Sequence, residues 1–586
     1  MKVLLVIVSV TCWFSVFGQA PIINEITPVS TYPGNTILIT GSGFSNMPIR
    51  LQVWFDNVKG TILSSSEFSI EVAVPFQARY ANIEVINLDT RLSTKSLKKF
   101  TPSFGSTSFV ASKFETPVAG TTSFPQTPGS EELFDVCTCD MDGDGKPDIA
   151  SSKSSSSSND IAILRNTSIP GTMSFESSSL ATATPPFNLD CGDLNGDGKP
   201  DLVASRGGIT RNEVLIFRNT STVGAISFAP VTKLFLDVGQ FAFRVMIKDL
   251  NQDGKPDMVV TNSFTSITDT SILYVFTNQS GGGTLSFNAV PTQVEVTGAA
   301  TTYSMDIEDL DDDQKPEIIL NQFNGSDIFI LKNASSVGQM SFPAIVRLPV
   351  AGSLNHLITA DFNEDGKSDI AVTSSVNDNK VFVLLNQSSA GTISFPSTMT
   401  LTGGDWPWGI EASDIDGDQD VDIITGNINN NRVTNEIVVF LNNGSNASLS
   451  FDRQSIQKGK RSRNLKVGDL DGDGKPDIAY TTGTGAGGGN SIDILRNTNC
   501  FTPVITNQTP LTICAGQTIS LRSTPSPGTT FSWKESANTP FKTSADPFAD
   551  ITTVGNYTVT ATQEAGTCMV QSAPISVTSS LGNVPQ

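Results

Sequence analysis

The chain has 586 residues, and its 58 acidic residues against 37 Lys and Arg leave a formal net charge of −21. This length predicts several domains, each long enough to bury a core. The acidic balance argues against nucleic acid as a partner, because an acidic surface repels phosphates. Charged residues make up only 16% of the chain, which argues against long coiled coils, and a single His leaves little for acid or base catalysis near neutral pH.

Residues 1–20 have the pattern of an export signal. Lys2 precedes an apolar run over residues 3–17, and residues 18–20 form a small-residue cleavage site. No later segment reaches the roughly 18 consecutive apolar residues that a membrane span requires. We therefore expect a secreted or cell-surface protein with no transmembrane segment in the mature chain.

Residues 21–102 alternate short apolar runs with Pro and Gly, which is typical of strands and turns. The run from Ile37 to Phe44, followed by the run from Val53 to Phe55, resembles the IPT/TIG immunoglobulin-like domain. The resemblance implies a β-sandwich over residues 21–102. Fold alone does not fix function, and the simplest role for this domain is that of a spacer.

A nine-residue acidic phrase organises the middle of the chain. It first reads Asp140-Met-Asp-Gly-Asp-Gly-Lys-Pro-Asp148, and seven copies occur at intervals of 52 to 60 residues. Such self-similarity at a nearly fixed period indicates a repeat architecture. The copies begin at Asp140, Asp193, Asp249, Asp309, Asp361, Asp414 and Asp469.

Each repeat supplies four predicted strands. One strand leads into the acidic phrase, two short runs rich in β-branched and aromatic residues follow it, and a Ser-Phe pair such as Ser174-Phe175 opens the fourth. Seven such units predict a seven-bladed β-propeller over residues 103–499, because radial closure leaves only short sheet edges. A linear β-solenoid is the alternative, but its repeats are usually much shorter.

The two ends of the repeat region suggest how the ring closes. The seventh repeat lacks its Ser-Phe strand, whereas an orphan strand of that kind, Ser108-Phe109 continuing to Phe114, precedes the first repeat. We therefore expect this N-terminal strand to complete the last blade.

The acidic phrase gathers oxygen ligands of the kind that Ca2+ prefers. Carboxylates at positions 1, 3, 5 and 9 and a backbone carbonyl at position 7 surround one point, and the Gly at position 6 permits the positive φ that folds the loop back. Without a cation the crowded carboxylates repel one another. A hairpin turn rich in Asp and Asn that holds no metal is the alternative.

We expect about seven Ca2+ sites, although Gln314 and Gln419 replace the Gly of position 6 in the fourth and sixth phrases. The predicted ligands are Asp140, Asp142, Asp144, Lys146 and Asp148; Asp193, Asn195, Asp197, Lys199 and Asp201; Asp249, Asn251, Asp253, Lys255 and Asp257; Asp309, Asp311, Asp313, Lys315 and Glu317; Asp361, Asn363, Asp365, Lys367 and Asp369; Asp414, Asp416, Asp418, Asp420 and Asp422; and Asp469, Asp471, Asp473, Lys475 and Asp477.

The phrase with its flanking strands resembles the FG-GAP/VCBS repeats that build the propellers of integrin α-type proteins. The resemblance covers roughly residues 103–499. It implies calcium loops with a structural purpose and a role in cell adhesion or in binding ligands outside the cell. An EF-hand does not fit, because strands flank the loop and its last acid falls at position 9 instead of 12.

Aromatic residues recur six residues before the first Asp of most phrases. This register places Phe134, Phe187, Phe243, Tyr303 and Trp408 together around the mouth of the channel. They either pack between blades or, with nearby Trp406, form a stacking platform for a sugar or peptide. The lone His356 has no evident nucleophile beside it, so we predict no catalytic residue.

Residues 500–586 complete the chain with a third module and a short tail. The segments around Trp533, the expected core residue, and Tyr557, near an expected strand corner, resemble the Ig-like domains of bacterial surface proteins. Six cysteines remain after the signal, an even number that suits disulfides in an oxidising compartment, but their pairing stays open. Their spacing matches no zinc pattern.

The sequence thus predicts an all-β protein, a seven-bladed propeller flanked by two immunoglobulin-like β-sandwich domains. Its expected function is non-catalytic binding of an extracellular glycan or protein, with calcium stabilising the propeller. The alternatives are a polysaccharide lyase or hydrolase on a propeller scaffold and a purely structural surface component. Triplets such as Asn166-Thr-Ser168 are either turn residues or glycan acceptors.

Overall fold

The computed structural model describes residues 20–579 apart from short gaps, so the predicted signal peptide lies almost wholly outside the described residues. The gaps are residues 56–57, 76–77, 79, 91, 104–108, 116–131, 155–158, 183, 207–211, 238–240, 263–269, 300–301, 376–377, 429–435, 445–448, 458–460, 483–490, 501, 504, 506–510, 514–517, 524–528, 536–539 and 564–567.

The predicted all-β fold is confirmed. Across the described ranges the regular elements are β-strands and two single-turn 3-10 helices, η1 (Pro48–Arg50) and η2 (Ala111–Lys113). None of the helices in that part of the chain has the length and apolar character needed to cross a membrane.

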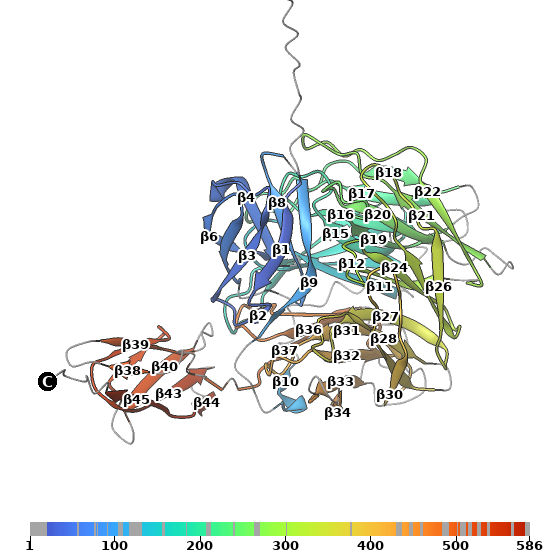
Figure 1. The fold of residues 1–586 in the computed structure, drawn as a ribbon. Helices are drawn as coiled ribbons and strands as arrows, with labels where there is room; N and C mark the ends of the chain where they lie inside the picture. Colours follow the sequence, from blue (N-terminus) through green and yellow to red (C-terminus); the bar gives the residue numbers. More distant parts are fainter. Residues whose placement is uncertain are drawn as a thin grey trace, which may run out of the picture.

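The N-terminal domain is a sandwich of two sheets (Figure 1). Ile39 and Val72 of one sheet and Val53 and Phe100 of the other share a single buried core. One sheet contains β1 (Ile22–Thr27), β3 (Thr36–Ser42), β7 (Ser69–Ala73) and β6 (Thr61–Ser65); the other contains β2 (Ser30–Thr31), β9 (Leu92–Pro102), β8 (Ala81–Asn87), β4 (Leu51–Phe55) and β5 (Val58–Lys59).

The middle of the chain is a ring of four-stranded antiparallel sheets, so the predicted propeller of repeated blades is confirmed (Figure 1). The described residues contain seven such sheets in this region. The blades are β11 (Glu132–Cys139), β12 (Asp148–Ser154), β13 (Asp160–Asn166) and β14 (Phe175–Ala181); β15 (Pro186–Gly192), β16 (Asp201–Arg206), β17 (Glu213–Phe217) and β18 (Thr232–Phe235); β19 (Ala242–Lys248), β20 (Asp257–Asn262), β21 (Thr270–Phe276) and β22 (Thr292–Thr297); β23 (Thr302–Glu308), β24 (Glu317–Gln322), β25 (Asp327–Lys332) and β26 (Ala344–Pro349); β27 (Leu354–Ala360), β28 (Asp369–Ser374), β29 (Lys380–Leu385) and β30 (Ser397–Thr402); β31 (Pro407–Ser413), β32 (Asp422–Asn427), β33 (Glu436–Asn442) and β34 (Phe451–Gln457); and β35 (Leu465–Gly468), β36 (Asp477–Thr481) and β37 (Ile492–Asn497) with β10 (Phe114–Glu115).

Apolar cores between neighbouring blades hold the ring together. The second and third strands of each blade are buried on both faces, because each blade packs face to face with two others. One core joins the third and fourth blades through Val259 and Ile318, and another joins the seventh and first blades through Ile492 and Ala162. The ring therefore closes through the same kind of core that links its consecutive blades.

The expected closing strand is confirmed. Strand β10 pairs antiparallel with β37, with Phe114 opposite Asn497. The Phe114 side chain is buried in the core between the sixth and seventh blades, and Lys113 O accepts a hydrogen bond from Thr498 N (2.8 Å). Ser108, the predicted start of the strand, lies outside the described residues.

The C-terminal segment forms its own β-domain, which Figure 1 shows in red beside the propeller. Trp533 is fully buried in its core, as predicted, and the Tyr557 hydroxyl donates to Thr553 O (2.9 Å). The Ig-like assignment of this domain stays a prediction. Its strands are β38 (Thr512–Ile513), β45 (Ile575–Ser579), β43 (Gly555–Gln563), β40 (Thr530–Glu535), β41 (Lys542–Ser544) and β44 (Cys568–Gln571) in one sheet, and β39 (Ile519–Arg522) with β42 (Phe548–Ile551) in another.

A disulfide between Cys139 and Cys191 joins the innermost strands of the first two blades. The sequence left this pairing open. Cys137 is buried in the same core between these blades, and Cys500 is also disulfide-bonded.

Candidate metal centres and the central channel

The first Asp of each acidic phrase folds the loop around its own carboxylate. In the first loop Asp140 Oδ1 accepts hydrogen bonds from the amides of Gly143 (2.8 Å) and Asp144 (3.1 Å), and Oδ2 accepts one from Gly145 (2.9 Å). Gly143 and Gly145 have φ of 75° and 89°, a conformation that glycine adopts at little cost. The loop is thus ordered by backbone hydrogen bonds to the carboxylate of its first Asp.

The last Asp ties the loop to its blade. Asp148 is fully buried, and its two carboxylate oxygens accept hydrogen bonds from the amides of Met141 and Asn166, both at 2.8 Å. Strand β12 begins at Asp148 and β13 ends at Asn166, so the loop and the hairpin that follows share one carboxylate.

The acids at positions 1, 3 and 9 converge in four of the seven loops. In each of these loops one oxygen from each acid lies within 4.8 Å of the other two. The groups are Asp140, Asp142 and Asp148; Asp309, Asp311 and Glu317; Asp414, Asp416 and Asp422; and Asp469, Asp471 and Asp477. The second, third and fifth loops have the carboxamides of Asn195, Asn251 and Asn363 at position 3.

The donor set fits a hard divalent cation such as Ca2+. All side-chain donors are oxygens, and Asp311 Oδ1 is buried without a hydrogen bond in the structure. An uncompensated buried carboxylate oxygen is costly, so this atom suits a cation ligand. Position 5 lies outside the three-acid groups, and in the first loop Asp144 Oδ1 accepts a hydrogen bond from Lys146 N (3.0 Å). The position 7 side chains differ in direction: Lys199 Nζ donates to Ser221 O (2.7 Å), whereas Lys475 Nζ lies 3.1 Å from Asp473 Oδ2 of its own loop.

The two loops without Gly at position 6 keep the same backbone shape. Gln314 and Gln419 have φ of 72° and 85°, close to the 89° of Gly145. Both loops also have three converging acids. The substitution therefore introduces backbone strain but leaves the loop geometry intact.

Burial shifts the acids of these loops toward protonation in the absence of a cation. It raises the pKa of Asp140 to about 7 and the pKa of Asp148 to about 8, and neighbouring carboxylates add to the shift. Burial likewise raises the pKa of Glu317 to about 8. A bound cation would reverse these shifts by favouring the ionised forms.

Three position 3 acids have basic partners that the sequence analysis missed. Arg165 Nε lies 2.6 Å from Asp142 Oδ2, Lys332 Nζ lies 3.0 Å from Asp311 Oδ2, and Arg496 pairs with Asp471. Each base directly precedes an Asn that ends the third strand of its blade or directly follows it. This shared register was the available signal.

The Asn at the end of each third strand was also missed as a structural residue. Its side-chain Nδ2 donates to the residue at position 2 of the preceding blade's loop, as in Asn278 to Leu194 O (2.9 Å). Asn166 is fully buried, and Ser168 N donates to its Oδ1 (2.9 Å), which supports the turn interpretation over a glycan acceptor. The seven residues are Asn166, Asn219, Asn278, Asn333, Asn386, Asn442 and Asn497.

The predicted aromatic residues meet at one end of the channel. Ring centroids are 4.7 Å apart for Phe187 and Phe243, 5.0 Å for Phe243 and Tyr303, and 5.6 Å for Tyr303 and Trp408. Phe134 packs against Phe187 at 3.6 Å. Six of the innermost strands have a β-bulge at this level, and bulges redirect side chains.

This aromatic cluster fills the channel end instead of forming an open platform. Phe243, Tyr303 and Trp408 are buried, whereas Phe134 and Phe187 are half-buried. Trp406 lies beside the cluster with 39% of its surface exposed and a φ of 57°. Phe323, which the sequence analysis did not include, packs between Tyr303 and Trp408.

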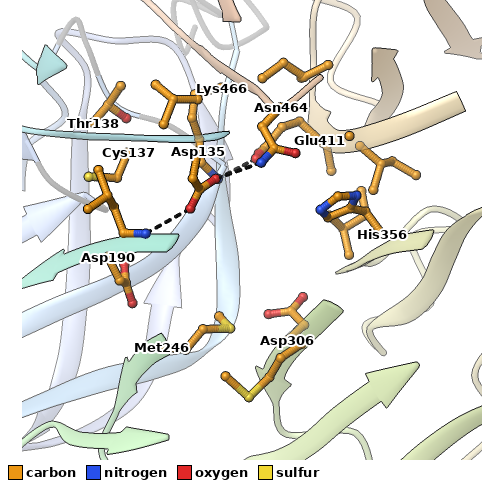
Figure 2. Close-up of a pocket in the computed structure, with 18 of the residues that line it drawn as sticks. Asp135, Cys137, Thr138, Asp190, Met246, Asp306, His356, Glu411, Asn464 and Lys466 are labelled. Atoms are coloured by element: carbon orange, nitrogen blue, oxygen red, sulfur yellow. Dashed lines mark hydrogen bonds and ion pairs between the residues drawn. The ribbon is translucent and has the colours of Figure 1, made fainter. Parts of the chain in front are cut away.

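Behind the cluster the channel holds a cavity of about 290 Å3 lined by charged residues (Figure 2). Asp135 accepts a hydrogen bond from Asn464 Nδ2 (3.0 Å), and Glu411 pairs with Lys466. Burial raises the pKa of Asp190 to about 6. The acids of the cavity are thus engaged in contacts that hold the innermost strands together.

His356 lines this cavity as a neutral ring. Burial lowers its pKa well below the usual value, and its Nδ1 lies 3.1 Å from Trp408 O. Because a carbonyl only accepts hydrogen bonds, Nδ1 carries the proton. The hydroxyl of Thr373 beside it donates to the same carbonyl (2.8 Å) and so is not activated by the ring.

A family model for the FG-GAP-like repeat matches residues 140–204, 249–320, 309–372, 361–425 and 414–480, more than half of the chain. The chain belongs to the FG-GAP-like repeat family. A model for the IPT/TIG domain matches residues 21–101, upstream of these FG-GAP-like repeats. A comparison with the curated proteins found no match.

Several solved structures are similar to this FG-GAP-like repeat protein over much of its length. An auxiliary nutrient binding protein from Bacteroides thetaiotaomicron VPI-5482 is 11% identical and aligns over 82% of this chain and 98% of its own, with a TM-score of 0.29. An auxiliary nutrient binding protein from Bacteroides ovatus ATCC 8483 is 10% identical and aligns over 82% of this chain and 98% of its own, with a TM-score of 0.30. The Dos1 propeller is 9% identical over 82% and 93%, with a TM-score of 0.37.

Proposed function

We propose that this protein is a secreted or cell-surface binding protein without catalytic activity, whose propeller is stabilised by Ca2+ and presents a surface for an extracellular glycan or protein. The convergence of three carboxylate oxygens within 4.8 Å in four loops supports the calcium sites. The oxygens of positions 1, 3 and 9 would hold the ion, and the ion would neutralise the buried acids and fix the loops. That role is structural, because the loops lie away from the aromatic end of the channel.

The observation that carries the binding role is the state of Trp406. This large aromatic side chain is exposed and sits on a backbone in the left-handed region, which is unfavourable for a bulky residue. Such strain persists where the surroundings enforce it and tends to occur at binding sites. Trp406 O accepts a hydrogen bond from Ile428 N (3.1 Å), and Ile428 packs against the aromatic cluster, so the surroundings hold Trp406 at the mouth of the channel.

A glycan and peptide array probed with the full chain in millimolar calcium tests the binding role. Trp406→Ala should abolish the signal by removing the stacking face. Phe548→Ala is the matched control, since it removes an aromatic side chain of the C-terminal domain that is equally exposed, at 39%. Equal signals from the two variants would show that Trp406 does not take part in binding. Turnover of a polysaccharide by the purified protein would contradict the non-catalytic role.

A further inference from the structure

The N-terminal domain lies on the face of the propeller that carries the acidic loops. Ser93 N donates to Gly254 O (2.7 Å) in the third loop, Ser103 Oγ donates to Gly417 O (3.4 Å) in the sixth, and Asp361 N in the fifth donates to the Tyr80 hydroxyl (3.1 Å). These contacts come from strand β9 and from the residues before β8 and after β9. The N-terminal domain therefore hydrogen-bonds directly to the backbone of the third, fifth and sixth loops.

Two of the glycines that the N-terminal domain contacts also bond to proposed calcium ligands. Gly254 N donates to Asp249 Oδ2 (2.9 Å), while Gly254 O accepts from Ser93. Gly417 N donates to Asp414 Oδ1 (2.7 Å), while Gly417 O accepts from Ser103. Only one residue thus separates a ligand carboxylate from a contact with the N-terminal domain.

The docked domain also closes the loop end of the channel. Tyr80, Asn82 and Lys99 line the cavity of about 290 Å3 together with the innermost strands. Lys99 Nζ donates to Thr359 O (2.6 Å) and lies 3.7 Å from Glu308. Burial disfavours the Lys99 ammonium, but Glu308 and the other nearby acids outweigh it and raise its pKa, so this buried cation is anchored to the propeller.

We propose that calcium at the third, fifth and sixth loops fixes the surface on which the N-terminal domain docks, so that loss of the ions releases the domain and opens this end of the channel. The inference rests on the proposed calcium binding. It follows because an ion that holds the loop backbone in its docked shape binds the docked state more tightly than the undocked one. By linkage, docking must in turn raise the calcium affinity of these loops.

The test compares the full chain in millimolar calcium chloride and after chelation with EGTA. Hydrogen exchange at the Ser93 amide reports the contact with Gly254. Acetylation of Lys99, measured by mass spectrometry, reports whether this side chain stays buried between the N-terminal domain and the propeller. Lys99 is largely shielded whereas Lys113 of η2 is exposed on the propeller, which makes Lys113 the internal reference. Chelation should raise exchange at Ser93 and acetylation of Lys99 by about tenfold, a typical size for such couplings, with Lys113 unchanged and β20 still protected.

Two matched variants separate the coupling from ion loss in general. Asn251→Ala and Asp311→Ala each remove the position 3 ligand of a loop, the third and the fourth. The fourth loop faces the N-terminal domain across a cavity of about 480 Å3, and within the described ranges no hydrogen bond joins the two. Asn251→Ala should expose Ser93 and Lys99 at calcium levels where Asp311→Ala leaves both protected.

Three outcomes would overturn the inference. If Ser93 and Lys99 stay protected after metal analysis shows that calcium has left, the coupling fails while the calcium sites stand. If β20 loses protection together with Ser93, the propeller has unfolded and no separate release of the domain exists. If the purified protein binds no calcium, this inference and the calcium part of the proposed function both fail.

Discussion

Asn166 of the first blade donates its side-chain Nδ2 to Leu470 O of the seventh blade at 2.8 Å. The bond joins the third strand of the first blade to the loop of the seventh acidic phrase. Six further Asn residues make the equivalent bond to the preceding blade, so one contact type runs around the ring. Ring closure thus repeats the contact between consecutive blades.

We predict that removing one of these bonds destabilises the propeller. Asn442→Ala deletes the bonds of Asn442 Nδ2 to Phe362 O (2.7 Å) and Val421 O (3.2 Å) and leaves two buried carbonyls without this donor. The expected loss is about 2 to 6 kcal/mol, since each of the two unsatisfied buried carbonyls costs about 1 to 3 kcal/mol. Denaturant unfolding measures it. Asn443→Ala is the control, because Asn443 Nδ2 bonds only within its own blade, to Leu441 O; equal losses in both would argue against a role between blades.

The closing strand should matter as much as a core strand although it is only two residues long. Phe114 is 1% exposed, so Phe114→Ala should cost about 3 to 5 kcal/mol, the usual range for a buried Phe. Glu115→Ala changes the exposed neighbour in the same strand and should have little effect. Thermal melting compares the two, and an unchanged melting temperature for Phe114→Ala would show that the ring closes without β10.

The features that the sequence predicted well are those whose residues recur at the repeat spacing. The acidic phrase repeats in register, so the blades and the convergence of Asp140, Asp142 and Asp148 followed from its spacing together with the apolar runs between its copies. The Asn contacts between blades did not follow from the sequence. A single Asn after a strand is typical of a turn, and its bonding partner lies in the neighbouring blade. The aromatic cluster was placed correctly at the channel end. Its burial depends on β-bulges and on Phe323, and the repeat pattern predicts neither of them.

Calcium occupancy should be measurable site by site. Asp311→Asn removes a carboxylate whose Oδ1 is buried without a hydrogen bond, and it should lower the number of bound ions by one. Asp312→Asn is the control, because Asp312 is exposed and lies outside the three-acid group of that loop. Each site held at a hundredfold over its dissociation constant adds about 2.7 kcal/mol, so chelation should lower the melting temperature steeply. Metal analysis with calorimetry checks both, and identical ion counts for the two variants would contradict the assignment of Asp311.

The stability of the metal-free protein should fall as the pH rises. Burial raises the folded-state pKa of Asp140 to about 7 and of Asp148 to about 8, above the unfolded value near 4. Between pH 4 and 8 the folded state therefore binds more protons than the unfolded state, and its stability decreases through this window. In EDTA the melting temperature should be higher at pH 5 than at pH 8. Calcium should reverse this order, because the ion binds the deprotonated acids and its affinity rises with pH. A melting temperature in EDTA that increases from pH 5 to pH 8 would mean that the loop acids are not protonated in the folded state.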